Sequence, residues 1–143
     1  MLNAHEFAAS NIVRVGILLP LSGSWPKGDQ RGRTIAGAAM LAVQDVNSDL
    51  SLLDGKLLEY SGEDSGCDSL ESMVGTNKIL LQAGQLDAII GPACSSACES
   101  SAYLLRDKAL PQVSFGCTES SLVKKYPTVC AATSAHMCIS SLN

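Results

Sequence analysis

Short apolar segments alternate with longer amphipathic segments along most of the chain. Ile12–Leu19 is short and rich in Val, Ile and Leu, which is typical of a strand buried in a parallel sheet. Further strands are predicted where short apolar or alternating runs are bounded by turn residues, at 56–62, 86–90, 111–115 and 129–132. The pattern therefore predicts five strands.

Helical spacing of apolar residues fills the intervals between these strands. The first predicted helix spans 34–47, with Thr34 as its N-cap. The others span 69–83, where Gly84 ends the helix, and 95–108, and a last helix is expected to begin at 135–142. Loops are predicted at 20–33, 63–68 and 116–121, where Gly, Pro, Ser and acidic residues gather.

Strands that alternate with helices indicate an α/β fold with a doubly wound parallel sheet. Right-handed crossovers leave few arrangements, and we expect the strand order 2-1-3-4-5. In such sheets ligands bind at the carboxyl ends of the strands, at the switch point between strands 1 and 3. The loops at 20–33 and 91–95 should meet there and form a binding site.

Composition narrows the class of protein and of partner. Of the 143 residues, 46% are hydrophobic and 17% are charged, so the chain can form an ordered core. The net charge is −4 and Lys and Arg form no basic stripe, which argues against a nucleic acid partner. No apolar run approaches the roughly 18 residues of a membrane helix. Residues 1–11 are expected to be a disordered tail, and they lack the features of a secretory signal.

Six cysteines suggest an oxidising compartment, which conflicts with the missing signal. We interpret residues 12–143 as a truncated part of a longer secreted or membrane protein. A cytosolic protein with reduced thiols is the open alternative.

Three groups of residues are candidates for ligand binding. Ser95 and Ser96 open the helix that follows the third strand, and a helix N-terminus binds anions. The alternative is that one of these serines is simply the N-cap. Thr118, in the loop after the fourth strand, could face the same crevice or belong to an ordinary polar turn. Trp25, in the loop after the first strand, could cover a ligand or lie in the core.

Other chemistries have weaker support. No dinucleotide or P-loop glycine pattern is present, so no cofactor is expected. Cys94 and Cys98 lack the second pair that structural zinc needs, and the two histidines, His5 and His136, form no credible triad. The acidic loop at 63–68 lacks the spacing of a calcium loop, and a solvated loop is the preferred interpretation.

Several segments resemble a known family: VGILLPLSG at 15–23, AVQDVN at 42–47 and AIIGP at 88–92. Together they resemble the receptor-family ligand-binding region, a type I periplasmic-binding-protein fold. SGSWP at 22–26, DVNS at 45–48, CD at 67–68, CSS at 94–96 and YP at 126–127 are similar to the Venus-flytrap domain of class C G-protein-coupled receptors, such as the type B γ-aminobutyric acid receptor. The resemblance covers about residues 12–140 and implies that the chain is the N-terminal lobe of a two-lobed domain.

The resemblance also implies roles for individual residues. Ser95 would bind the ligand carboxylate with the backbone N–H of Ser96, Thr118 would supply a second hydroxyl, and Trp25 would contact the ligand. It further implies a Cys67–Cys94 disulfide, which would contribute roughly 3–4 kcal/mol of stability. Two features depart from the family: Glu119 lies beside the anion site, and four cysteines (98, 117, 130 and 138) are additional.

The predicted function is ligand sensing by an extracellular lobe of a membrane receptor. The lobe would sense an amino acid or a γ-aminobutyrate-like molecule, signal by lobe closure, and perform no catalysis. The second lobe, a membrane signalling domain and a dimer partner would lie outside this chain. Three alternatives keep the fold but change the output: a receptor guanylate cyclase, a channel-type glutamate receptor and a soluble transport-binding protein. Two further alternatives are a small enzyme with Cys94 or Cys117 as nucleophile and a degenerate product without activity.

Overall fold

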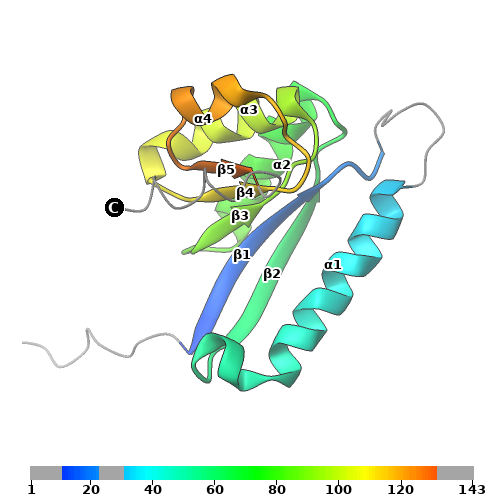
Figure 1. Cartoon of the computed structure of the whole chain (residues 1–143), viewed down its shortest axis with the longest axis vertical. Coiled ribbons are helices and arrows are strands. Elements are labelled where there is room, and N and C mark those ends of the chain that lie inside the picture. The colour runs from blue at the N-terminus through cyan, green and yellow to red at the C-terminus, as the bar shows by residue number, and fades with distance from the viewer. Residues whose placement is uncertain (1–10, 23–30, 132–143) are drawn as a thin grey trace, which may run out of the picture.

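The computed structural model describes residues 11–22 and 31–131, which form a five-stranded, all-parallel sheet (Figure 1). The strand order is β2-β1-β3-β4-β5, so the predicted order is confirmed. The strands are β1 (Ile12–Leu19), β2 (Leu57–Asp64), β3 (Ala88–Ile90), β4 (Gln112–Ser114) and β5 (Val129–Ala131). Residues 1–10 of the tail predicted at 1–11 and the last predicted helix lie outside the described residues, whereas the carbonyl of Asn11 accepts from the N–H of Leu57 at 2.9 Å.

Four α-helices and two 3-10 turns connect these strands within the described part of the chain. They are α1 (Arg31–Ser48), α2 (Ser69–Gln82), α3 (Ser95–Leu105) and α4 (Ser120–Lys125), with 3-10 turns at Leu50–Leu53 and Arg106–Lys108. Among them, no helix is both long enough and apolar enough to cross a membrane.

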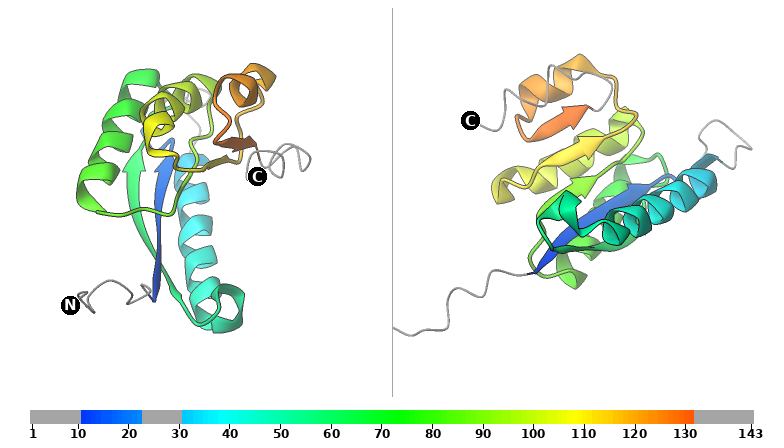
Figure 2. Two further views of the ribbon diagram at one scale, coloured as in Figure 1. Left: turned by 90° about the vertical axis from the view of Figure 1, so that its left-hand side faces the viewer. Right: turned by 60° about the horizontal axis from the view of Figure 1, so that its bottom comes forward.

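Alternating side chains of β1 divide the core between the two faces of the sheet. Val15, Ile17 and Leu19 are buried on the face that α1 covers. Leu18 is fully buried on the opposite face, in a cluster with Ile79 of α2. Figure 2 shows α1 alone on one side of the sheet and α2, α3 and α4 on the other. Burial on both faces explains why β1 is a continuous apolar run.

Helix α1 begins earlier than predicted. It starts at Arg31, so Thr34 lies within the helix and the prediction that Thr34 is the N-cap is wrong. The start depends on a tertiary contact, because a side chain at Gly32 would collide with the backbone carbonyl of Pro20. Only glycine allows the first turn of α1 to approach the end of β1 this closely.

Helix α4 occupies sequence that the local pattern predicted to be partly loop. It has only six residues and its N-cap position, Glu119, makes no capping hydrogen bond. Its stability comes instead from packing, since Leu122 and the following Tyr126 are buried against Ala102 of α3. Six residues are too few for a helical periodicity to be visible in the sequence.

Candidate ligand-binding site

The loop after β3 passes directly over the end of β1, at the predicted switch point of the sheet. Gly91 has a positive φ of 90°, and a Cβ atom there would collide with the carbonyl oxygen of Leu18. Glycine is therefore required at this position. The close approach seats the N-terminus of α3 at the carboxyl edge of the sheet, where ligands bind in this class of fold.

The N-terminal turn of α3 has no side-chain cap. Its N-cap residue is Cys94, which has an extended backbone (φ −97°, ψ 138°) and makes no capping hydrogen bond. Ser95 and Ser96 are the first two helical residues, so the alternative that one of them is the N-cap is wrong. Cys94 cannot cap because its sulfur is in a disulfide, and the first N–H groups of α3 thus keep their capacity to bind an acceptor.

Both serine hydroxyls at this tip are available. Ser95 is half-buried and Ser96 is exposed. Neither hydroxyl has a hydrogen-bond partner among residues 11–22 and 31–131, although the carbonyl of Ser96 accepts from the hydroxyl of Ser69 at 3.2 Å. A half-buried hydroxyl beside N–H groups that have no acceptor in the described part of the chain favours binding of an anion.

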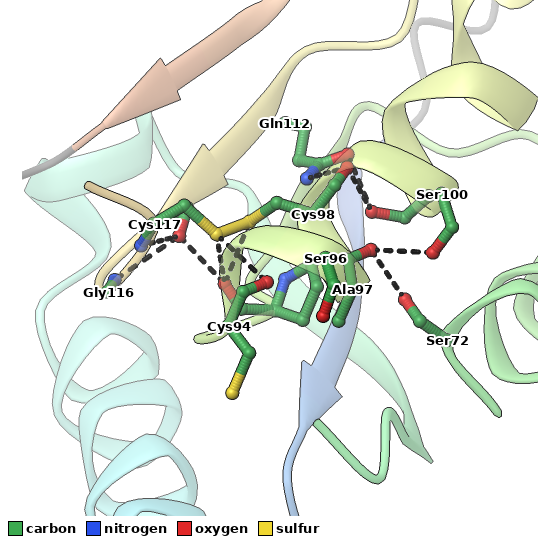
Figure 3. Close-up of a disulfide and its surroundings, with 12 residues drawn as sticks. Ser72, Cys94, Ser96, Ala97, Cys98, Ser100, Gln112, Gly116 and Cys117 are labelled. Carbon is green, nitrogen blue, oxygen red and sulfur yellow. Dashed lines mark hydrogen bonds between the residues drawn. A yellow bond between two sulfur atoms is a disulfide. The ribbon is translucent and has the colours of Figure 1, made fainter. Parts of the chain in front are cut away.

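The Cys67–Cys94 disulfide is present and joins the starts of α2 and α3. The Cα atoms are 5.3 Å apart. Ser72 of α2 strengthens the connection, because its buried hydroxyl donates to the carbonyl of Ala97 at 2.8 Å (Figure 3). The disulfide and the hydrogen bond hold the first turns of the two helices side by side, which fixes the turn that presents Ser95.

The loop that carries Thr118 lies against the loop after β3. A Cβ atom on Gly116 would lie 2.7 Å from the carbonyl oxygen of Ala93, so the two loops are in direct contact. Thr118 itself is exposed, and its hydroxyl has no hydrogen-bond partner in the described part of the chain. The structure therefore brings the loops of Ser95 and Thr118 together at one edge of the sheet. Trp25 lies outside the described residues.

A second disulfide, Cys98–Cys117, connects α3 to the loop of Thr118, with 6.5 Å between the Cα atoms (Figure 3). Both residues are buried, at 0% and 3% exposure, in the cluster beneath α4. Their sulfur atoms lie 3.3 Å from the carbonyl oxygen of Pro92, and these are packing contacts because a disulfide has no S–H group. No local sequence pattern indicates this pair. Cys130 is also disulfide-bonded.

Glu119 is exposed and lies at the N-cap position of α4. Its carboxylate accepts a hydrogen bond of 2.9 Å from the hydroxyl of Ser121, at the start of α4. The side chain thus has a hydrogen-bond partner at the start of α4.

The interpretation of residues 63–68 as a solvated acidic loop is wrong. Glu63 and Asp64 belong to β2, where they pair with Leu18 and Leu19 of β1. The carboxylate of Asp64 accepts from backbone N–H groups, and Asp68 caps α2. Among the described residues no group of three or more His, Cys, Asp or Glu is arranged to hold a metal ion.

The cysteines named for an enzymatic alternative are both oxidised. Cys94 and Cys117 belong to the two disulfides described above, and no cysteine in the described ranges is free. A disulfide sulfur is not a thiolate nucleophile, so this arrangement does not support cysteine catalysis.

Comparison with known proteins agrees with this geometry. The family model described as "Receptor family ligand binding region" matches residues 34–138. The chain belongs to this family. Among its curated members, the mouse γ-aminobutyric acid type B receptor subunit 1 is 30% identical over 128 residues, which are 88% of this chain and 13% of that receptor. Glutamate receptor 3.4 of Arabidopsis thaliana is 32% identical over 91 residues, 64% of this chain and 9% of that receptor.

The family fold is confirmed by solved structures. The isoleucine-bound branched-chain amino acid binding protein LivJ of Streptococcus pneumoniae has a TM-score of 0.71 at 24% identity, over 84% of this chain and 33% of that one. A Rhodopseudomonas palustris solute-binding protein in complex with 3,4-dihydroxybenzoic acid has a TM-score of 0.70 at 17% identity, over 85% and 32%. The chain has the fold of one lobe of a type I periplasmic binding protein and spans about a tenth of the curated receptors' length.

Proposed function

We propose that residues 12–143 are the N-terminal lobe of an extracellular receptor domain and bind the carboxylate of an amino acid or a γ-aminobutyrate-like molecule. The proposal rests on the N-terminus of α3, which has no side-chain cap. The loop of Thr118 is connected to this end of the helix by the Gly116–Ala93 contact and the Cys98–Cys117 disulfide. The names of the relatives support the ligand class, since glutamate, γ-aminobutyrate, isoleucine and dihydroxybenzoate share a carboxylate.

The proposed chemistry uses donors that have no other acceptor among residues 11–22 and 31–131. The carboxylate would accept from the hydroxyl of Ser95, the N–H of Ser96 and the hydroxyl of Thr118, while the dipole of α3 favours its charge. Trp25 would cover the ligand. A second lobe would grip the opposite end, and closure of the two lobes would shift the receptor between two states.

A binding titration tests the carboxylate site. We expect γ-aminobutyrate, L-glutamate or L-leucine at millimolar concentration to shift the NMR signals of Ser95, Ser96 and Thr118, and n-butylamine, which lacks the carboxylate, to leave them unchanged. Ser95→Ala should weaken binding about tenfold, because a hydrogen bond to a charged group is lost. Equal affinity of wild type and Ser95→Ala would contradict the proposed site.

Ser100→Ala is the matched control for this titration. Ser100 lies on the same helix, but its hydroxyl donates to the carbonyl of Ala97 at 3.0 Å and not toward the tip. The control should bind like wild type. Calorimetry on the 143-residue chain should detect no micromolar affinity, because one lobe supplies only part of the contacts, and a micromolar Kd would refute the one-lobe proposal.

A soluble solute-binding protein is the second candidate, because the solved structures similar to this lobe include transport-binding proteins. The complete coding sequence distinguishes the two candidates. A second lobe followed by membrane spans supports the receptor, and a second lobe without them supports the solute-binding protein.

A further inference from the structure

Ser114, the last residue of β4, connects the two loops of the site through all the hydrogen bonds its hydroxyl can make. The hydroxyl donates to the carbonyl oxygen of Pro92 at 2.7 Å, in the loop after β3. It also accepts from the N–H groups of Gly116 at 3.2 Å and Cys117 at 2.9 Å, in the loop after β4. A hydroxyl has one donor and two acceptor sites, so Ser114 is saturated by contacts to these two loops alone.

Burial makes this connection rigid. Ser114 is 0% exposed, and water cannot replace its partners without opening the core. The Cys98–Cys117 disulfide holds the same loop to the first turn of α3 by a covalent bond. The loop of Thr118 is therefore connected to residues on both sides of Ser95. Ser114 connects it to Pro92 by a hydrogen bond, and Cys117 connects it to Cys98 by a disulfide.

We infer that Ser114 and the Cys98–Cys117 disulfide, here called the Ser114 clamp, fix the position of Thr118 relative to Ser95 before a ligand arrives. The inference rests on the proposed function, because it gives Thr118 its binding role. Its consequence is preorganisation: the two hydroxyl donors are already held in place, so less conformational freedom is lost when the carboxylate binds. Ser114 is thus a positioning residue that acts through Thr118.

A second buried serine provides a matched control. Ser101 is also 0% exposed, and its hydroxyl lies 3.1 Å from the carbonyl oxygen of Cys98 and 3.0 Å from the amide oxygen of Gln112, two acceptors that share its single proton. None of these hydrogen bonds reaches the loop of Thr118. Ser101→Ala should therefore lower the stability much as Ser114→Ala does, while leaving the two site loops in place.

Hydrogen exchange tests the clamp without any ligand. In Ser114→Ala, the N–H groups of Gly116 and Cys117 should exchange about tenfold faster than in Ser101→Ala at matched global stability, because both have lost their acceptor. Equal exchange rates in the two variants would overturn the clamp. If Ser114→Ala does not fold, the same comparison is made with Cys98→Ala/Cys117→Ala, in which the N–H of residue 117 should be the more affected.

A double-mutant cycle tests whether the clamp acts through Thr118. With γ-aminobutyrate, L-glutamate or L-leucine as probe, Thr118→Ala should weaken binding about fivefold in the wild-type background and less than about twofold in the Ser114→Ala background. A purely structural role of Ser114 would leave the effect of Thr118→Ala unchanged, and that result would overturn the inference.

The two proposals fail in different ways. If wild type responds to none of the three carboxylates, the proposed function fails, and the binding part of this inference fails with it. The exchange rates of Gly116 and Cys117 still decide whether the clamp exists. If wild type binds but the cycle shows no coupling, the proposed function stands and the clamp is overturned.

Discussion

The carboxylate of Asp64 accepts a hydrogen bond of 2.8 Å from the backbone N–H of Leu21, two residues beyond the end of β1. It also accepts from the N–H groups of Ser22 at 3.0 Å and Gly66 at 2.8 Å. Partial burial by itself would raise the pKa of Asp64, but the hydrogen bonds from Ser22, Gly66 and Leu21 together outweigh it and lower the pKa below the ordinary value. The ionised side chain thus holds the loop after β1 to the end of β2.

The sign of the pH dependence follows from this lowered pKa. A carboxyl group that ionises more easily in the folded state contributes stability above its unfolded pKa of about 3.9, and the contribution is lost as the pH falls toward the folded pKa. We expect Asp64→Asn to lower the free energy of unfolding by about 1 kcal/mol at pH 7 and the difference from wild type to shrink below about pH 4.

Urea unfolding between pH 3 and pH 7 measures this difference. Asp45→Asn is the control, because Asp45 is exposed on α1 and its carboxylate has no partner among the residues that the structure describes. A constant gap between wild type and Asp64→Asn over the whole pH range would contradict the role of the ionised carboxylate.

Two helical glycines should respond to alanine with opposite signs. Gly37 in α1 has open space around its Cα, so Gly37→Ala should stabilise the protein by about 0.5–1 kcal/mol through helix propensity. Gly75 in α2 is buried, and a Cβ there would lie 2.6 Å from the carbonyl oxygen of Asp64. Gly75→Ala should therefore destabilise by about 1–3 kcal/mol, because α2 must move away from β2. Thermal unfolding of both variants checks the signs, and stabilisation by Gly75→Ala would show that the helix is not closely packed there.

The Cys67–Cys94 and Cys98–Cys117 disulfides should contribute similar loop-closure entropy, but the burial of their cysteines differs. They close loops of 27 and 19 residues, for which the chain-entropy model gives about 3–4 kcal/mol each. Cys98→Ala/Cys117→Ala should cost more than Cys67→Ala/Cys94→Ala, because Cys98 and Cys117 are buried and the substitution also leaves a cavity. Urea unfolding of the two double variants measures the difference, and a larger loss for the Cys67–Cys94 pair would contradict this ranking.

Asp68 caps α2, since its carboxylate accepts from the N–H groups of Leu70 at 2.8 Å and Glu71 at 3.1 Å. Asp68→Ala should lower the free energy of unfolding by about 1 kcal/mol, whereas Asp68→Ser should retain most of the stability because serine can accept the same hydrogen bonds. Chemical unfolding of both variants checks the cap. Equal losses for alanine and serine would show that the carboxylate stabilises α2 in another way.

Patterns that depend on neighbouring residues predicted most of the fold. The apolar run Ile12–Leu19 coincides with β1, and helix α2 begins at the predicted Ser69. The alternation of strands and helices was sufficient for the order of the parallel sheet, because crossover handedness leaves few arrangements. The same reasoning predicted that the loops of Ser95 and Thr118 lie at one edge of the sheet, and the structure brings these two loops into contact.

The helix boundaries and side-chain roles that the sequence pattern did not predict depend on contacts between residues that are distant in the chain. The first turn of α1 places Gly32 against the carbonyl of Pro20, and α4 packs Leu122 and Tyr126 against Ala102 of α3. Asp64 resembled a solvated loop residue because its acceptor role depends on Leu21, 43 residues away.

The sequence by itself was sufficient for the fold class and the strand order, because these follow from hydrophobic periodicity and from the order of elements along the chain. Only the tertiary structure decided that Cys98 pairs with Cys117 and that Ser114 joins the two loops of the site. Cys98 and Cys117 are 19 residues apart in the chain, and Ser114 and Pro92 are 22 residues apart. These contacts exist only after the sheet has brought the ends of β3 and β4 together.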